Sequence, residues 1–459
     1  MKIKNICCIG AGYVGGPTMA VIALKCPNIK VTVVDSNPDK IKSWNGNIKN
    51  LPVFEPGLSE IVKEVRGRNL FFSSEIDKSI NESEMIFMAV NTPTKKEGEG
   101  AGMAADLKYI KACAVNIAKV AKTDKIIVEK STLPVRTAEK IKEILYSEGN
   151  GVNFEILSNP EFLAEGTAIK DLFKSDRVLI GGDNTKTGQS AVKSLVDIYT
   201  NWIPKEKILT TNVWSSELSK LASNAMLAQR ISSINSFSAL CEKTGADIDD
   251  LSKAIGMDKR IGSKFLNTSV GFGGSCFKKD ILNLVYLCKY YNLDEVAEFW
   301  NQVLKINQYQ KNRFSDKIIG RLGGSLEGKT ISILGWAFKK NTNDSRESAS
   351  IDVTLNLLIA GAKVKIYDPM VNKLRILNDL ESLLKERKYS KNKIDLIMAR
   401  VKILKNHIQA IKNCDAITIL TEWDEFKNYE WDKILNKPSN IILFDGRNIT
   451  SKANYSIGK

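Results

Sequence analysis

The stretch CIGAGYVGGP, residues 8–17, decides how this chain begins to fold. It continues an apolar segment at residues 6–9 and places Gly10, Gly12 and Gly15 in a G-x-G-x-x-G spacing. The first glycine permits a tight turn, the second lets the backbone approach the phosphates of a ligand, and the third lets the next helix pack on the strand. The spacing therefore predicts a strand, a turn and a helix whose N-terminus faces an anion.

A carboxylate ends the second predicted strand. VTVVD, residues 31–35, ends at Asp35, about twenty residues after Gly15, which is the spacing of the dinucleotide-binding fingerprint. A carboxylate there suits the ribose diol of NAD and repels the 2′-phosphate of NADP. A lone glycine motif is weak evidence, and a glycine-rich turn beside an exposed Asp is the alternative. Together the two features predict an NAD-binding, Rossmann-like domain.

Strand and helix patterns alternate along most of the chain. Further strands are expected at residues 85–90, 126–129, 154–157 and 178–181, and again at 329–335, 362–367, 417–420 and 441–444. Residues 214–241 lack Gly and Pro and have apolar residues at helical spacing, which predicts one long helix. Such alternation favours parallel sheets covered by helices on both faces.

We therefore expect an α/β fold with two Rossmann-like doubly wound domains joined by a central helical domain with one long helix. The expected boundaries are 1–212 for the NAD-binding domain, 213–325 for the central helical (dimerisation) domain and 326–459 for the second Rossmann-like domain. The charged stretch 380–405 is expected to be a variable excursion.

Composition narrows the classes of function. The chain has 459 residues, a net charge of +15 and 43% hydrophobic residues, and its apolar runs fall short of the roughly 18 residues that span a membrane. We expect a cytoplasmic protein with no membrane partner. The basic residues are scattered, which suits anionic small molecules or merely a Lys-rich surface, and they predict no nucleic-acid partner.

Cysteine and histidine usage restricts the chemistry. None of the eight cysteines lies in a CxxC pair, which argues against a metal site or a redox disulfide. His407 is the only histidine and lies in a polar stretch far from the glycine-rich loops. A dehydrogenase of this sequence would therefore use Lys, Glu, Asp or bound water as its base.

One cysteine stands in an unusual setting. GFGGSCFKKD, residues 271–280, places three glycines before Cys276 and a helical pattern after it. Helix N-termini favour thiolates, and Lys278 and Lys279 add positive charge nearby. Asp280 lies about one turn along the same face. We interpret Cys276 as a nucleophile and the other cysteines as small packed thiols.

Two further sets of polar residues are candidates for the site. Lys220 and Asn224 share one face of the long predicted helix, although a solvated helix surface explains them equally well. SNPEFLAEG, residues 158–166, offers Glu161 and Glu165 at a strand end, where doubly wound sheets bind ligands. A loop cap is the alternative for either carboxylate.

These segments together resemble the UDP-glucose and GDP-mannose dehydrogenase family, and most closely its animal members that act on UDP-glucose. The resemblance covers nearly the whole chain through GAGYVGGP, VNTPT, EKST, LSNPEFLAEGTAIKDL, SSELSKLASNA, GFGGSCFKKD, AFKK and FDGR. It implies NAD-dependent four-electron oxidation of UDP-glucose to UDP-glucuronate through a cysteine thiohemiacetal and thioester, with two NADH formed per sugar. It also implies a homo-oligomer, a dimer at least and a hexamer (trimer of dimers) in full, that binds UDP-glucose and other UDP-sugars.

The resemblance assigns roles to individual residues. The implied catalytic residues are Cys276, Glu161, Lys220, Asn224, Asp280 and Thr132, with Cys276 as nucleophile, Glu161 activating water and Thr132 positioning it. The implied NAD-binding residues are Gly10, Ala11, Gly12, Tyr13, Val14, Gly15, Asp35, Lys40, Val90, Asn91, Thr92, Pro93, Thr94, Ser131, Thr132, Glu165, Lys279 and Arg346. The implied substrate-binding residues are Glu161, Phe162, Leu163, Ala164, Glu165, Lys220, Asn224, Arg260, Asn267, Phe272, Gly273, Phe338, Lys339 and Arg447. Arg260 is expected to reach the sugar site of a neighbouring subunit, and Lys40 replaces the Arg expected near the adenine ribose.

Three alternatives stay open at this point. The same chemistry could act on another nucleotide sugar such as GDP-mannose. A hydroxyacid or 6-phosphogluconate-type dehydrogenase would need no thiol and would keep its activity without Cys276. A non-catalytic NAD-binding protein is the third alternative, which the Cys, Lys, Asn, Asp and Glu set argues against. Which of Lys220, Asp280 or bound water is the base of the first oxidation is left open.

Overall fold

The computed structural model describes residues 2–149, 151–435 and 441–458, and the chain divides into two compact units. The first unit comprises residues 1–223 and Leu282–Tyr291, and the second comprises Asn224–Ile281 and residues 292–459. Both boundaries fall inside helices, because α9 (Val213–Thr244) and α11 (Phe277–Tyr290) contribute residues to both units. Neither unit is therefore one continuous stretch of sequence.

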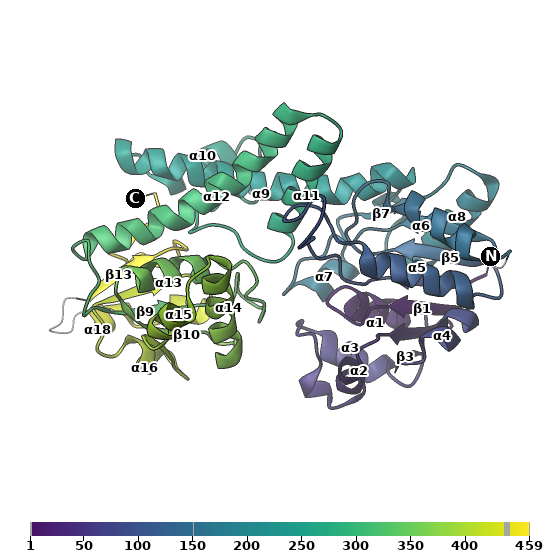
Figure 1. Cartoon of the computed structure of the whole chain (residues 1–459), viewed down its shortest axis with the longest axis horizontal. Helices are drawn as coiled ribbons and strands as arrows, with labels where there is room; N and C mark the ends of the chain where they lie inside the picture. The colour runs from purple at the N-terminus through teal and green to yellow at the C-terminus, as the bar shows by residue number, and fades with distance from the viewer. Residues whose placement is uncertain (1, 150, 436–440, 459) are drawn as a thin grey trace. The chain divides into compact units, whose positions relative to one another are not determined.

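The described part of the first unit contains an eight-stranded sheet in the order β3-β2-β1-β4-β5-β6-β7-β8. Figure 1 labels β1, β3, β5 and β7 of this sheet. Neighbouring strands are parallel except β6 and β7, which pair antiparallel through Ser158 and Gly181. The strands are β1 (Asn5–Ile9), β2 (Lys30–Val34), β3 (Leu70–Ser73), β4 (Met85–Met88), β5 (Lys125–Glu129), β6 (Phe154–Ser158), β7 (Val178–Gly181) and β8 (Ile208–Thr211). The carboxyl ends of β1, β2, β4, β5 and β6 consequently meet at one edge.

Helices cover both faces of this sheet because its strands are apolar on both sides. Ile6 and Cys8 of β1 pack in a cluster with α1, α2, α3, α7 and α8, whereas Cys7 and Ile9 pack with α4, α5 and α6. Successive side chains of a strand point to opposite faces, so a continuous apolar run can feed two cores. The helices are α1 (Gly15–Lys25), α2 (Pro38–Asn45), α3 (Leu58–Val65), α4 (Ile76–Glu82), α5 (Lys108–Val120), α6 (Thr137–Glu148), α7 (Ala168–Phe173) and α8 (Lys186–Tyr199), with short 3₁₀ turns η1 (Ile48–Asn50) and η2 (Lys205–Lys207).

The end of α11 completes the first unit. Asn283 accepts a hydrogen bond from the backbone N–H of Ala105 at 3.4 Å. Gly100 has a φ of +75°, and a Cβ added to it would lie 2.8 Å from the Tyr286 ring. The loop after β4 is thus held against a helix that comes much later in the sequence.

The second unit begins with helices and ends with a second sheet. Its helical part contains the rest of α9 and α11 together with α10 (Ile248–Gly256) and α12 (Asp294–Arg321). Its described six-stranded sheet has the order β11-β10-β9-β12-β13-β14, and all of its strand pairs are parallel. The strands are β9 (Thr330–Leu334), β10 (Lys363–Tyr367), β11 (Val401–Ile403), β12 (Ala416–Ile419), β13 (Ile442–Asp445) and β14 (Tyr455–Ser456), and the helices are α13 (Ala349–Ile359), α14 (Lys373–Glu386), α15 (Lys391–Met398), α16 (His407–Ile411), α17 (Asp424–Lys427) and α18 (Trp431–Leu435).

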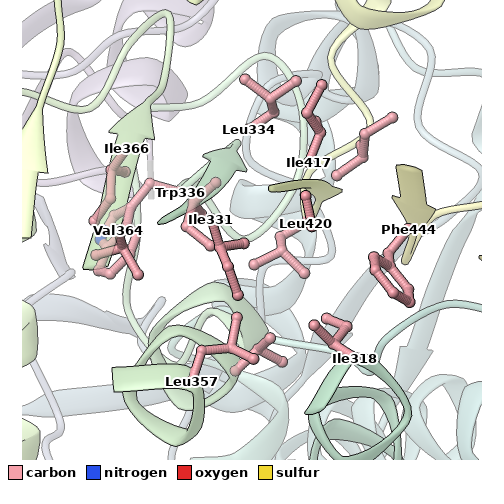
Figure 2. Close-up of a cluster of buried hydrophobic side chains, with 14 of the residues drawn as sticks. Ile318, Ile331, Leu334, Trp336, Leu357, Val364, Ile366, Ile417, Leu420 and Phe444 are labelled. Carbon is pink, nitrogen blue, oxygen red and sulfur yellow. The ribbon is translucent and has the colours of Figure 1, made fainter. Parts of the chain in front are cut away.

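The core of the second sheet forms between its strands and the helices beside them. Figure 2 shows Leu357 of α13 and Ile318 of α12 on the side of the sheet toward which Ile331 of β9 points. Trp336 and Phe444 are among the largest fully buried side chains of the chain. This cluster fixes the strand ends at which the loops of the second unit begin.

The two sheets repeat one topology. In each sheet, the first six strands along the chain have the spatial order third, second, first, fourth, fifth, sixth, and the first sheet adds β7 and β8 after them. Gly10 and Gly335 follow the first strand of each sheet with φ of +116° and +97°, and Asp35 and Asp368 follow the second strand. The expected pair of Rossmann-like folds around a helical segment is confirmed.

One expectation about the second sheet is wrong. Residues 380–405 are not an excursion, because they form the end of α14, all of α15 and edge strand β11. Leu380, Leu384, Ile394 and Ile397 are buried in the core of this sheet. These apolar residues lie among many charges that face outward, which concealed the helical spacing.

Candidate active site

The glycine-rich turn between β1 and α1 has the shape that a pyrophosphate requires. A Cβ at Gly10 would lie 2.4 Å from the Ala89 carbonyl oxygen, and one at Gly15 would lie 2.0 Å from the Gly10 carbonyl oxygen. A Cβ at Gly12 would have no atom within 4 Å. The first and third glycines thus pack against backbone, while the second leaves open space beside the N-terminus of α1. The residues present fit a dinucleotide phosphate.

Asp35 is fixed at the end of β2. Its carboxylate accepts hydrogen bonds from the backbone N–H of Ala11 at 2.9 Å and of Asn37 at 3.0 Å. Lys40 donates to the same carboxylate at 2.8 Å. Burial alone would raise the pKa of Asp35, but these three donors outweigh it and lower the pKa. Asp35 is therefore a fixed anion with a cation beside it.

The loops after β4 and β5 are tied together at the same sheet edge. Ser131 donates to the Val90 carbonyl oxygen at 2.6 Å, and Thr92 donates to the Thr132 carbonyl oxygen at 3.0 Å. The segment that follows β4 is consequently hydrogen-bonded to the segment that follows β5. This joins the candidate cofactor residues 90–94 to the candidate water-positioning residue Thr132.

Glu161 lies just after β6 at the centre of a buried network. Lys130, which follows β5, forms an ion pair with Glu161 at 2.9 Å and also donates to Asn159 and to Tyr199. The backbone N–H groups of Phe162 and Leu163 donate to the other carboxylate oxygen at 2.9 and 3.2 Å.

Charge and burial oppose each other in this network. Burial alone would raise the pKa of Glu161, but the charge of Lys130 outweighs it and lowers that pKa. Burial alone would lower the pKa of Lys130, but Glu161 and Tyr199 raise it to about 12. Both groups are thus ionised at neutral pH. Sequence reasoning missed Lys130, Asn159 and Tyr199, although Lys130 lies in EKST and a lysine directly after a buried strand was a usable signal.

Lys220 contacts the same region of the first unit from α9. Its ammonium lies over the Phe162 ring, 5.4 Å from the centroid, and its side chain is buried. Arg177 stacks on the same ring at 3.9 Å. Lys220 also contributes to lowering the pKa of Glu161. The structure thus brings Glu161, Phe162 and Lys220 together.

Cys276 directly precedes α11, as the glycine pattern predicted. Its side chain is exposed, and its carbonyl oxygen accepts from the backbone N–H of Asp280 at 2.9 Å. Gly271 and Gly274 in the preceding loop have φ of +123° and +85°, which side chains disfavour. The loop therefore places an accessible thiol at a helix N-terminus, and this environment favours the thiolate form.

Asn224 and Asp280 form a buried pair one turn from that thiol. The Asn224 amide donates to the Asp280 carboxylate at 2.6 Å, and Lys279 approaches the other oxygen of Asp280 at 3.5 Å. Both Asn224 and Asp280 are buried. The amide and the carboxylate can together orient a water or an alcohol oxygen.

The loop of residues 267–273 is held against the second sheet. Asn307 of α12 accepts from the Phe272 N–H at 2.8 Å and donates to the Phe272 carbonyl oxygen at 3.0 Å. A Cβ at Gly273 would lie 2.9 Å from the Cβ of Phe338, and Arg447 donates to the Phe338 carbonyl oxygen at 3.0 Å. Lys339 lies over the Phe338 ring at 5.6 Å. The expected substrate residues Phe272, Gly273, Phe338, Lys339 and Arg447 are thus linked, and Asn307 was missed.

Of the remaining expected residues, Arg260 lies apart from these clusters and Arg346 borders one of them. Arg260 is highly exposed and pairs with Asp258 at 2.7 Å. Arg346 pairs with Asp344 at 2.7 Å, and its carbonyl oxygen accepts from the N–H of Gly274. Arg346 therefore borders the glycine loop before Cys276 through its backbone.

The described residues show no cluster of metal ligands and no membrane-spanning helix. These residues contain no group of three or more His, Cys, Asp or Glu side chains that could hold a metal ion. Within the same described ranges, every helix is too short or too polar to cross a membrane. All eight cysteines fall in the described ranges, and none of them forms a disulfide bond.

Comparison with known proteins gives matches over the whole length. The UDP-glucose/GDP-mannose dehydrogenase family's NAD binding domain matches residues 4–203, its central domain matches 214–309 and its UDP binding domain matches 332–452. UDP-glucose 6-dehydrogenase 1 of Glycine max is 53% identical and UDP-glucose 6-dehydrogenase 4 of Arabidopsis thaliana is 54% identical, each over 99% of this chain and 97% of the relative. The structure of a UDP-glucose dehydrogenase from Pyrobaculum islandicum aligns with a TM-score of 0.84 and 28% identity, over 99% of this chain and 97% of that one. These relatives are plant and archaeal proteins, so they do not support the expected closeness to animal members.

Proposed function

Because this chain belongs to the UDP-glucose/GDP-mannose dehydrogenase family, we propose that it oxidises UDP-glucose to UDP-glucuronate with NAD. The observation that carries the proposal is an accessible Cys276 at the N-terminus of α11, in a chain that matches UDP-glucose 6-dehydrogenases over 99% of its length. When bound, each NAD would accept one hydride, so the four-electron oxidation would consume two NAD in succession. The glycine turn and Asp35 would hold its pyrophosphate and ribose.

Cys276 allows the oxidation to proceed beyond the aldehyde. The first oxidation removes a hydride and a proton from the primary alcohol and leaves an aldehyde. The Cys276 thiolate then adds to the aldehyde carbon, and the aldehyde oxygen takes up a proton to give a thiohemiacetal. Loss of a second hydride together with that proton converts the thiohemiacetal to a thioester. Water attacks the thioester, the carbon–sulfur bond breaks and UDP-glucuronate leaves with the free thiol restored. The aldehyde therefore stays bonded to the protein.

The polar residues act on the oxygens of these intermediates. Lys220 and Asn224 stabilise oxygens that gain negative charge, because preorganised donors act strongly in a buried site. Glu161 takes a proton from the attacking water, and Thr132 positions that water. Lys220, Asp280 or a bound water accepts the alcohol proton in the first oxidation.

The proposal also includes the expected domain bounds, binding residues, location and assembly. We assign residues 1–212, 213–325 and 326–459 to the NAD-binding, central helical and UDP-binding domains, in the order of the three matching family domains. Residues 90–94, Ser131, Glu165, Lys279 and Arg346 complete the cofactor site, and the loop 267–273 with Phe338, Lys339 and Arg447 holds the UDP-sugar. Eight cysteines without a disulfide bond suit a reducing cytoplasm. The working form is a homo-oligomer, a hexamer in full, in which Arg260 completes a neighbouring sugar site.

Cofactor stoichiometry tests the reaction directly. We expect two NADH for each UDP-glucose consumed, measured by absorbance together with chromatography of the nucleotide sugars. One NADH per sugar with free aldehyde released would contradict the thioester route. A parallel assay with GDP-mannose tests the second substrate of the family, and faster oxidation of GDP-mannose would overturn the assignment to UDP-glucose.

A further inference from the structure

We propose that Lys130 is a positioning residue that keeps Glu161 ionised and aimed for hydrolysis of the thioester on Cys276. The inference rests on the proposed function and adds a residue to its water-dependent step. Lys130 does not touch the reacting atoms in this scheme, because it acts through the carboxylate.

The ammonium of Lys130 has no freedom to point elsewhere. An ammonium group has three N–H donors, and Lys130 uses them on Glu161 at 2.9 Å, on Asn159 at 3.0 Å and on Tyr199 at 3.2 Å. Tyr199 in turn donates to Asn159 at 2.7 Å, and Asn159 donates to the Leu179 carbonyl oxygen at 2.8 Å. The side chain of Lys130 is only 3% exposed. Lys130 is thus anchored on the sheet.

Glu161 depends on this cation for its charge. The other groups that face its carboxylate are two backbone N–H groups, the Thr18 hydroxyl at 3.4 Å, the nearby Tyr199 and the more distant Lys220. Burial favours the neutral form of the carboxylate, and Lys130 contributes most to opposing it, by its charge and by its hydrogen bond. A protonated Glu161 could not accept a proton from water. Removal of Lys130 should therefore slow hydrolysis, most of all at acidic pH, and spare the hydride transfers.

Strand β5 offers a matched control at its other end. Lys125 is also buried, and its ammonium donates to the carbonyl oxygens of Asn81 and Ser83 at 3.0 and 2.7 Å and to Thr123 at 3.0 Å. Lys125→Met removes a buried, fully hydrogen-bonded ammonium from the same strand without touching Glu161. This control variant measures how much the loss of any buried, hydrogen-bonded ammonium on this strand affects stability and activity.

Rapid mixing of each full-length variant with UDP-glucose and NAD, between pH 6 and 9, tests the proposal. In Lys130→Met we expect two NADH per Cys276 in a first phase, then a steady state at least tenfold slower than in the wild type. Mass spectrometry should show the acyl adduct on Cys276, and hydrolysis should recover as pH rises. Lys125→Met should show neither the adduct nor the altered pH profile. The proposal fails if Lys130→Met keeps the wild-type profile, or if both variants accumulate adduct equally. Wild-type protein that forms no NADH would instead refute the proposed function.

A double variant covers the case in which Lys130→Met does not fold. Loss of Lys130 leaves the charge of Glu161 buried without a partner, and Glu161→Gln removes that charge. We therefore expect Lys130→Met combined with Glu161→Gln to melt at a higher temperature than Lys130→Met alone, or to fold where the single variant does not. Strictly additive melting temperatures would show that the two residues are not coupled, which would overturn the proposal.

Discussion

Among single residues, Cys276 differs from the other seven thiols in its environment. Cys276 is exposed before a helix N-terminus, whereas six of the others are buried and Cys113 is half-buried. Burial raises the pKa of Cys26 and of Cys113 to about 11. These thiols stay protonated at neutral pH and cannot replace Cys276 as nucleophile.

This difference leads to a prediction for Cys276→Ser. The serine hydroxyl can add to the aldehyde, but the resulting ester resists hydrolysis more than a thioester does. Steady-state formation of UDP-glucuronate should fall by at least a hundredfold, and mass spectrometry should detect a stalled adduct. Cys288→Ala, in the helix α11 that follows Cys276, should keep its activity. Near-normal turnover with unmodified protein in Cys276→Ser would remove Cys276 from the mechanism.

Asp35 leads to a prediction about cofactor choice. Its carboxylate would repel a 2′-phosphate, while Lys40 at 2.8 Å offsets part of that repulsion. The wild type should therefore prefer NAD to NADP. Asp35→Ala should reduce the preference at least tenfold, which is about 1.4 kcal/mol, and Lys40→Met should increase it. Ratios of kcat/KM for the two cofactors measure both effects, and equal ratios in all three proteins would contradict this role of Asp35.

The sequence predicted the reactive residues better than it predicted the residues that hold them in place by hydrogen bonds. Gly10, Asp35 and Cys276 carry local signals, such as a glycine spacing or a helix beginning, and their surroundings match what those signals predicted. Lys130 donates hydrogen bonds to Asn159 and Tyr199, which lie 29 and 69 residues away in the sequence. Asn307 accepts a hydrogen bond from Phe272, which lies 35 residues away. No periodicity links such positions, because the pairing is set by which strand ends meet in the folded sheet.

At the scale of elements, α6 begins in an unusual way. The residue before it, Arg136, has a φ of +76°, and its side chain makes no capping hydrogen bond. Glu217 of α9 supplies the acceptor instead, because its carboxylate accepts from the N–H groups of Arg136 and Ala138, both at 2.8 Å. Glu129 at the end of β5 is buried beside Glu217. The loop that carries Thr132 thus ends at a pair of carboxyl groups.

This pair predicts a pH dependence of stability. Burial raises the pKa of Glu217 from 4.5 to about 7, and burial together with Glu217 raises the pKa of Glu129 above its usual range. The folded state therefore holds more protons than the unfolded state between pH 4.5 and 7, so the pair's contribution to the free energy of unfolding falls as pH rises through this range. Glu129→Gln should weaken that dependence. Urea unfolding of both proteins at pH 5, 6 and 7 measures it, and parallel curves would contradict the assignment.

Strands and helices were predictable from the sequence where their own residues form a clear apolar pattern. The buried strands β1, β2, β4, β5, β6 and β7 and the long helix α9 lie close to their expected positions. Strand β8 was missed because its exposed and half-buried residues carry no apolar run, and β11 is a three-residue edge strand. Such strands are specified by their neighbours in the sheet and not by their own residues.

At the scale of the whole molecule, the long helix carries a prediction about assembly. Met226, Phe237 and Leu240 of α9 are 54%, 47% and 59% exposed, respectively, although they lie in a helix with a catalytic candidate. Exposed apolar side chains on one helix suit a two-fold interface, in which each substitution acts twice. Light scattering should find a dimer or larger species in the wild type and smaller species in Leu240→Glu, with activity lost on dilution. Leu396→Glu on α15, where the leucine is 70% exposed, is the control. A fully active wild-type monomer would contradict the prediction.

The division of α9 and α11 between the two units has a consequence for the nascent chain. Ribosomes deliver the N-terminus first, and domains that are continuous in sequence can fold as they emerge. Here the loop after β4 receives its partners Asn283 and Tyr286 only after residues 224–281 have been translated. The first sheet can form early, but the side of it that holds that loop stays incomplete until the thiol at Cys276 has also left the exit tunnel. The first unit and the reactive cysteine are thus completed within a few codons of each other. A truncated product that ends before Cys276 therefore lacks both the nucleophile and a complete first unit.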